Sequence, residues 1–235
     1  MRPALVATSH GTSSPEGRRA VAALVEAVRQ RLPHVEVLDA FVDVQEPSPD
    51  AVMARLRGPA VVVPLLLAPG FHVRVDIARA ASVPGASAAP TLAPDSRVVT
   101  VLVRRLLEAG TCDDDVVVMA SAGSSDDHAR ACFEEVARDL SAAIGQIVPV
   151  GYVGGTGRPL DDVVADARAG GVDRRVVVSS LLMAPGFFHD RIAHADVDVV
   201  TRPLLDDGPV DTRLVDLVLE RYSDAAAQGT WSGTG

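Results

Sequence analysis

Apolar positions along the chain follow two different spacings. Short, nearly unbroken runs of Val, Leu and Ala, such as ALVAT, VVVPLLL and VVVSSLL, predict strands buried on both faces. Between these runs, apolar residues recur every three or four positions, which predicts amphipathic helices. In the first half, after the ALVAT strand, the pattern predicts strands over 35–41, 60–67 and 87–92 and helices over 16–32, 49–56, 73–81 and 96–109.

The same order of elements occurs twice. VATSHGTSS at 6–14 aligns with VMASAGSSD at 118–126, an offset of 112 that also pairs Pro47 with Pro159. VVVPLLLAPGF at 61–71 aligns with VVVSSLLMAPGF at 176–187. We therefore predict an α/β protein of two tandem doubly wound parallel-sheet units related by internal duplication. The predicted units span 1–110 and 115–225, and a flexible tail is predicted over 226–235.

Polar residues follow three of the predicted strands in the first unit. His10 ends the first strand, Asp43 and Glu46 follow the second, and His72 begins the helix after the third. Because ligands of such sheets bind beyond the carboxyl ends of the strands, we expect these side chains at one edge. Two imidazoles with one or two carboxylates suit a borderline divalent metal ion.

Structural interpretations of these residues stay open beside the metal site. A histidine at a strand end is often only hydrogen-bonded, and Glu46 could cap the helix that begins near Pro49. The turn SHGTSS could cradle a phosphate, although it lacks the GxGxxG and GxxxxGK[ST] spacings. His34, His128 and His194 are predicted to be surface residues.

The duplication favours the metal site, because the second copy keeps the scaffold residues and changes the polar ones. In the aligned positions the second copy has Ala122 for His10, Gly155 for Asp43 and Arg158 for Glu46, with His189 displaced by about one residue from the position of His72. Side chains that served folding alone would be expected in both copies.

Composition argues against several classes of function. The net charge of −9 disfavours a general binder of nucleic acid or acidic membranes, and no apolar run is long enough to span a bilayer. Cys112 and Cys132 lack the CxxC spacing of a zinc knuckle, and the chain does not open on a signal-peptide pattern. We therefore expect a cytoplasmic protein.

The strand end HGT, the acidic-x-x-Glu-Pro segment and PLLLAPGFHVRVDI resemble the sirohydrochlorin chelatases, the CbiX/SirB family of class II chelatases. LLMAPGFFHDRI is similar to the second half of the long, two-unit members. The resemblance implies a metal chelatase of the lyase class, which inserts Co²⁺ or Fe²⁺ as substrate into sirohydrochlorin or a related tetrapyrrole without a nucleotide. The product would serve cobalamin or siroheme biosynthesis.

The resemblance also assigns roles to the candidate residues. The family's two histidines fall on His10 and His72, and its carboxylate falls on Asp43, where Glu is more usual. Insertion removes two pyrrole protons, and a neutral imidazole can both bind the metal and accept a proton. The carboxylate would neutralise the ion and orient an imidazole.

The expected partner is the tetrapyrrole, whose carboxylates we expect to meet Arg74, Arg158 and Arg191. We expect a monomer with a pseudo-dimeric internal repeat. Two other functions remain open at this point: a non-enzymatic metal-binding chaperone or degenerate paralogue on the same fold, and an enzyme acting on phosphate ligands.

Overall fold

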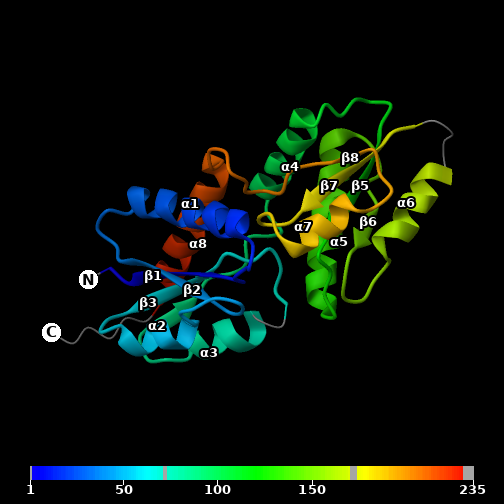
Figure 1. Cartoon of the computed structure of the whole chain (residues 1–235). Helices are drawn as coiled ribbons and strands as arrows, with labels where there is room; N and C mark the ends of the chain where they lie inside the picture. Colours follow the sequence, from blue (N-terminus) through cyan, green and yellow to red (C-terminus); the bar gives the residue numbers. More distant parts are fainter. Residues whose placement is uncertain (1, 71–72, 170–173, 230–235) are drawn as a thin grey trace. The chain divides into compact units, whose positions relative to one another are not determined.

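The computed structural model describes residues 2–70, 73–169 and 174–229, which contain two four-stranded parallel sheets (Figure 1). The order of the first sheet is β2 (Val37–Phe41), β1 (Ala4–Ser9), β3 (Ala60–Pro64) and β4 (Ala86–Ala88). The second sheet repeats this order with β6 (Val150–Tyr152), β5 (Val116–Ser121), β7 (Val176–Leu181) and β8 (Val199–Val200). The predicted fold class is confirmed.

Helices connect the parallel strands, as such crossovers require. The first repeat contains α1 (Pro15–Arg31), α2 (Pro49–Arg55), the π-helix η1 (Val73–Ile77), α3 (Ala78–Ala81) and α4 (Ser96–Glu108). The second contains α5 (Asp127–Ile144), α6 (Leu160–Ala169), α7 (Phe187–Ala193) and α8 (Thr212–Gln228). No helix in the described part of the chain is long and apolar enough to cross a membrane.

The last helix corrects the predicted tail at 226–235. Helix α8 continues to Gln228, so 226–228 are helical, and residues 230–235 lie outside the described part of the chain. The reason is that α8 buries Tyr222 and Ala225 near its end, and the following alanines have high helix propensity.

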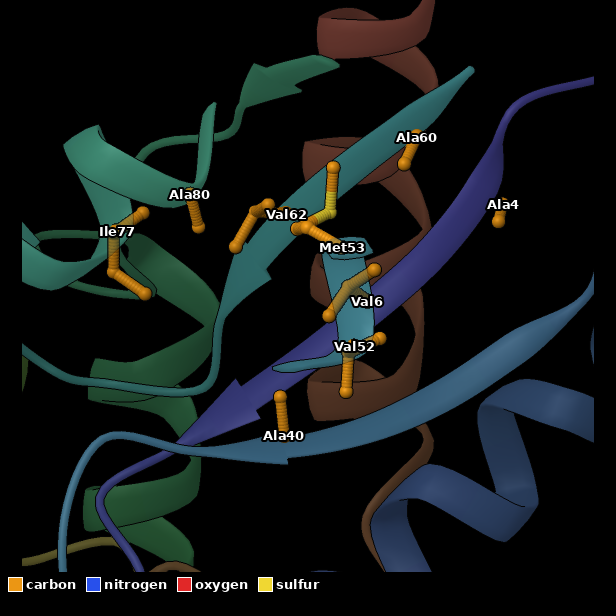
Figure 2. Close-up of a cluster of buried hydrophobic side chains, with 9 residues drawn as sticks. All are labelled: Ala4, Val6, Ala40, Val52, Met53, Ala60, Val62, Ile77 and Ala80. Atoms are coloured by element: carbon orange, nitrogen blue, oxygen red, sulfur yellow. The ribbon is translucent and has the colours of Figure 1, made fainter. Parts of the chain in front are cut away.

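The central strands β1, β3, β5 and β7 are mostly apolar and fully or almost fully buried, because helices cover both faces of each sheet. On one face of the first sheet, side chains of β1, β2 and β3 meet those of α2, η1 and α3 (Figure 2). The labelled cluster consists of Ala4, Val6, Ala40, Val52, Met53, Ala60, Val62, Ile77 and Ala80. In the second unit an equivalent cluster joins β5 and β7 to α6 and α7.

Two helices pack outside the repeat to which they belong in sequence. Helix α4 ends the first repeat but contacts α5 and β7, within the compact unit Ala93–Pro209. Helix α8 ends the second repeat but contacts α1, β3 and β4, and in Figure 1 its orange-red ribbon lies among the blue and cyan elements. The compact units therefore divide at 92/93 and 209/210, whereas the predicted units 1–110 and 115–225 followed the sequence repeat.

One buried and one partly buried hydrogen bond hold α8 in the first unit. The Tyr222 hydroxyl donates to Pro3 O at 2.6 Å, and Arg221 Nε donates to Thr91 O at 3.1 Å. Both acceptors are backbone carbonyls of the first repeat, so the second repeat completes the first sheet's helical cover through specific polar contacts.

A buried arginine has the same role for α4. Arg105 is only 4% exposed, donates to Leu204 O at 3.0 Å and pairs with Asp206 at 3.1 Å. Its hydrogen bond also lowers the pKa of Glu108 to about 2. A buried charge held by several partners makes α4 a fixed part of the second unit.

Arg105→Ala should lower the free energy of unfolding by about 2–3 kcal/mol, because it leaves the buried Asp206 carboxylate and the Leu204 carbonyl with fewer partners. The matched control is Arg104→Ala on the same helix, whose exposed side chain also pairs with Glu108 and should cost about 0.5 kcal/mol or less. Urea denaturation measures both values. Equal losses in the two variants would contradict the anchoring role.

Candidate functional site

Strands β1 and β2 end side by side at the carboxyl edge of the first sheet. Ser9 pairs with Phe41 at the last position of the ladder. Beyond the strands, Val42 N donates to Ser9 O at 3.0 Å, and Asp43 N donates to His10 O at 2.9 Å. His10 and Asp43 are therefore neighbours in adjacent loops, and both are exposed.

Gly11 permits this close approach of the two loops. Its φ is +87°, and a Cβ there would lie 2.1 Å from Asp43 O. No side chain fits, and the conformation is one that glycine adopts without strain. On the far side of Gly11, Thr12 N donates to Gln45 Oε1 at 2.9 Å, so the two loops are joined on both sides of the glycine.

The second loop contains a strained residue next to the candidate carboxylate. Val44 has a φ of 62°, a rare conformation for a β-branched residue, and is 54% exposed. Its amide donates to Asp43 Oδ1 at 2.8 Å. One carboxylate oxygen of Asp43 is thereby fixed by its own loop.

Glu46 supports the turn before α2, but the N-cap of that helix is Ser48. Glu46 Oε2 accepts a hydrogen bond from Ser48 N at 2.9 Å, and Ser48 Oγ in turn caps α2 by accepting from Ala51 N at 3.3 Å. Among the described residues no three His, Cys, Asp or Glu side chains gather as a metal cluster, so Glu46 does not form one with His10 and Asp43 alone.

Two of the candidate residues follow β3. His72 lies outside the described residues, and although the backbone of Arg74 belongs to η1, its side chain lies outside the described structure as well. In the second unit the positions that correspond to the candidate residues lie within the described structure, and the strand ends there have the same backbone contacts.

The second sheet repeats the strand-end geometry with a one-residue change of alignment. Ser121 pairs with Tyr152, Val153 N donates to Ser121 O at 3.1 Å, and a Cβ at Gly123 would lie 1.9 Å from Gly154 O. In the first unit the same three contacts are the pairing of Ser9 with Phe41, the hydrogen bond from Val42 N to Ser9 O, and the approach of Gly11 to Asp43 O.

The counterpart of Asp43 is therefore Gly154, which corrects the pairing with Gly155 made from the sequence. Gly155 instead matches Val44, and both have a φ in the left-handed region. Likewise Tyr152 N donates to Arg158 O where Phe41 N donates to Pro47 O, so Arg158 is not the counterpart of Glu46. The sequence offset failed here because matching Pro47 to Pro159 concealed a one-residue difference ahead of β6.

The counterpart of His72 is found from the pairing of β3 and β7 with the central strands. Pairing to the central strands gives Ala60 and Val176 equivalent places, and the sequence continues without a gap through both APGF segments, so His72 corresponds to Phe188. A Cβ at Gly154 would lie 3.1 Å from Ala122 O and 3.6 Å from Phe188 Cε1. The second unit thus brings together the three positions that correspond to His10, Asp43 and His72.

The other basic side chains have different surroundings. Arg158 pairs with Asp166 and donates to Asp162 O along α6. Arg191 and His194 instead line a cavity of about 440 Å³ in the second unit. The ring of His189 donates from Nε2 to Thr201 O at 3.2 Å, which gives it a structural role.

This cavity was missed in the sequence. Its walls are the glycine-rich loop after β6, the start of α6 and the end of α7. The available signal was the run GGTG directly after a strand, a pattern in which missing side chains leave space at a sheet edge.

Neither cysteine belongs to a cluster of three or more potential metal ligands in the described part of the chain. Cys132 is buried in α5, and burial raises the pKa of its thiol to about 11, so it stays protonated near neutral pH. Cys112 is exposed.

Comparisons with known proteins agree with this architecture. The CbiX family model matches residues 4–109 and 116–225, which are the two repeats. No curated protein matches the chain. Among solved structures, SirB from Bacillus subtilis with Fe³⁺ has a TM-score of 0.77 at 19% identity, covering 97% of both chains.

Two further structures are similar. SirB from Bacillus subtilis subspecies spizizenii in complex with cobalt has a TM-score of 0.74 at 20% identity and covers 97% of both chains. CbiX, described as the terminal enzyme for biosynthesis of siroheme in denitrifying bacteria, has a TM-score of 0.66 at 16% identity and covers 94% of this chain and 99% of its own. At such identities the likeness establishes the fold.

Val44→Gly should raise the free energy of unfolding by about 1 kcal/mol, because it removes a left-handed β-branched residue at a place where the second unit has glycine. The reciprocal change, Gly155→Val, should destabilise the protein, since its Cβ would lie 2.6 Å from Ser124 N. Chemical denaturation of both variants measures the difference. A loss of stability in Val44→Gly would refute the proposed strain.

Proposed function

The chain belongs to the CbiX family of sirohydrochlorin chelatases, and on this premise we propose that it inserts Co²⁺ or Fe²⁺ into sirohydrochlorin or a related tetrapyrrole. The observation that carries the proposal is the family match across both repeats, together with the adjacency of His10 and Asp43. The metal ion is a substrate, and no nucleotide takes part. The product would enter cobalamin or siroheme biosynthesis.

We assign the incoming metal to His10, His72 and Asp43. Imidazole nitrogen and carboxylate oxygen form a ligand set that suits these divalent ions. The convergence of Ala122, Gly154 and Phe188 in the second unit supports a common site for their three counterparts. Glu46 stays a fourth candidate ligand, since Ser48 N occupies only one of its oxygens, as Val44 N does for Asp43.

Insertion exchanges one divalent ion for two pyrrole N–H protons, so two protons leave the macrocycle for each metal bound. The neutral imidazole of His10 or His72 accepts a proton on its unprotonated ring nitrogen and passes it to water. Asp43 provides the negative charge that lowers the cost of bringing the cation to the sheet edge. Its side chain is shorter than the usual Glu, so the backbone contact that places it at His10 is correspondingly important.

The macrocycle presents carboxylates, which arginine binds through paired hydrogen bonds. Arg74 belongs to the same repeat as the metal ligands, and we assign it to substrate binding there. Arg158 and Arg191 belong to the second unit, and each is likewise expected to bind a carboxylate of a tetrapyrrole, since a guanidinium does not bind a cation. The duplication places both units in one chain, and we expect the monomer to be active.

Anaerobic incubation of the protein with sirohydrochlorin and Co²⁺ or Fe²⁺, followed by absorbance, should show metal insertion above the uncatalysed rate. His10→Ala, His72→Ala and Asp43→Asn should each reduce kcat by about 100-fold or more, because each removes a ligand or proton acceptor. His34→Ala is the matched control, since this exposed histidine precedes β2 at the opposite edge of the sheet.

The melting temperatures should stay within a few degrees of the unmodified protein, since the altered side chains at 10 and 43 are exposed. Near-normal rates in the His10 and His72 variants would refute the metal assignment. Tight Co²⁺ binding without any insertion would identify a non-enzymatic metal-binding protein instead.

A further inference from the structure

The second unit has a cavity beside the counterpart of the first unit's candidate metal site, and Gly154, the counterpart of Asp43, is part of its lining. The cavity, of about 440 Å³, lies beyond the carboxyl end of β6 and is lined by the loop from Tyr152 to Gly157, the start of α6, and residues of α7. Its loop is the structural counterpart of the one that contains Asp43. The volume falls within the range of small-molecule sites.

The three positions that correspond to metal ligands are apolar here. Ala122, Gly154 and Phe188 supply no nitrogen or oxygen from a side chain, and the Phe188 ring approaches the place of a Gly154 Cβ. In the described part of the chain no acidic or histidine cluster replaces them. At these three positions a cation would find no side-chain ligand, whereas the Phe188 ring offers an aromatic face.

Phe188 and its neighbour Phe187 are both exposed. Phe187 is 65% exposed and Phe188 is 39% exposed, with ring centroids 5.3 Å apart in an edge-to-face arrangement. They are two of only five phenylalanines in the chain. Exposed adjacent rings of this size cost solvation free energy unless a ligand covers them.

The positively charged side chain of Arg191 lies next to the rings. The Arg191 guanidinium lies 5.9 Å from the Phe187 centroid, and within the described structure it has no ion pair or hydrogen bond. His194 donates from Nδ1 to Asp190 O at 2.6 Å, which leaves its Nε2 available. Asp161 contributes an opposing charge at the start of α6, so the cavity is not uniformly basic.

We propose that the second unit binds a macrocycle of its own, without metal, so that one chain holds two tetrapyrroles. The macrocycle would stack on the Phe188 ring with Phe187 beside it, and one carboxylate arm would enter the cavity to meet Arg191. This inference rests on the proposed function, because duplication of a macrocycle-binding unit identifies the class of ligand. Because the second copy lacks the side chains that would bind a metal, it would bind a macrocycle without metallating it.

The experiment is an anaerobic titration of the full-length protein with metal-free sirohydrochlorin, without added metal, read by absorbance of the macrocycle. The unmodified protein should bind two macrocycles per chain. Phe188→Ala and Arg191→Gln should each weaken one of the two binding events by about tenfold or more and leave the other unchanged. Leu107→Ala and Arg138→Gln, which alter exposed residues on α4 and α5, are the matched controls and should bind two.

A stoichiometry of one in the unmodified protein would overturn the second site, as would variants at 188 and 191 that weaken both events equally. Both altered residues are exposed, and an unchanged melting temperature would confirm that each variant is folded. The insertion assay separates this result from the proposed function. A protein that binds two macrocycles but inserts no metal contradicts the proposed activity, and one that inserts metal but binds one macrocycle contradicts the second site.

Discussion

The approach of two backbone loops at a glycine is the constraint on which both sheet edges depend. At Gly11 and at Gly123 a Cβ would lie 2.1 and 1.9 Å from a carbonyl oxygen of the neighbouring loop. The missing side chain allows hydrogen bonding to continue past the strand ends, which brings the first residue after β1 next to the second residue after β2. Whatever chemistry a unit performs at this edge is determined by which side chains occupy those adjacent positions.

The two units use this common geometry for different side chains. The first has His10 and Asp43, whose charges and lone pairs suit a metal ion and protons. The second has Ala122 and Gly154 and adds Phe188 from the start of α7, which removes every ligand atom and leaves an apolar surface beside Arg191. Backbone geometry has thus been kept while chemistry has diverged, and the strained Val44 lies where the second unit has glycine.

The exchange of terminal helices explains why the two repeats remain one protein. Helix α8 covers the first sheet and α4 covers the second, so neither repeat by itself includes all the helices that bury its sheet. Tyr222 and Arg105 fix these helices through buried polar contacts, which a shifted or detached helix could not satisfy. Side-chain chemistry at either edge can therefore change without loss of the shared framework.

The sequence by itself determined the order of strands and helices, the duplication and the placement of His10 and Asp43 at strand ends, because these follow from local periodicity and from the rule that parallel strands end at one edge. It did not determine every strand's bounds, since β4 covers Ala86–Ala88 where 87–92 was predicted. Tertiary structure decided the rest. The hydrogen-bond register shows that the counterpart of Asp43 is Gly154, whereas the sequence alignment gave Gly155. Sequence matching cannot detect such a one-residue shift in a glycine-rich loop. Packing assigned α4 and α8 to the opposite units, and side-chain contacts bound Glu46 to its own turn and Arg158 to α6 while leaving Arg191 at a cavity. These outcomes depend on contacts between residues far apart in the chain or on the choice of hydrogen-bond partner, and neither has a local signature in the sequence.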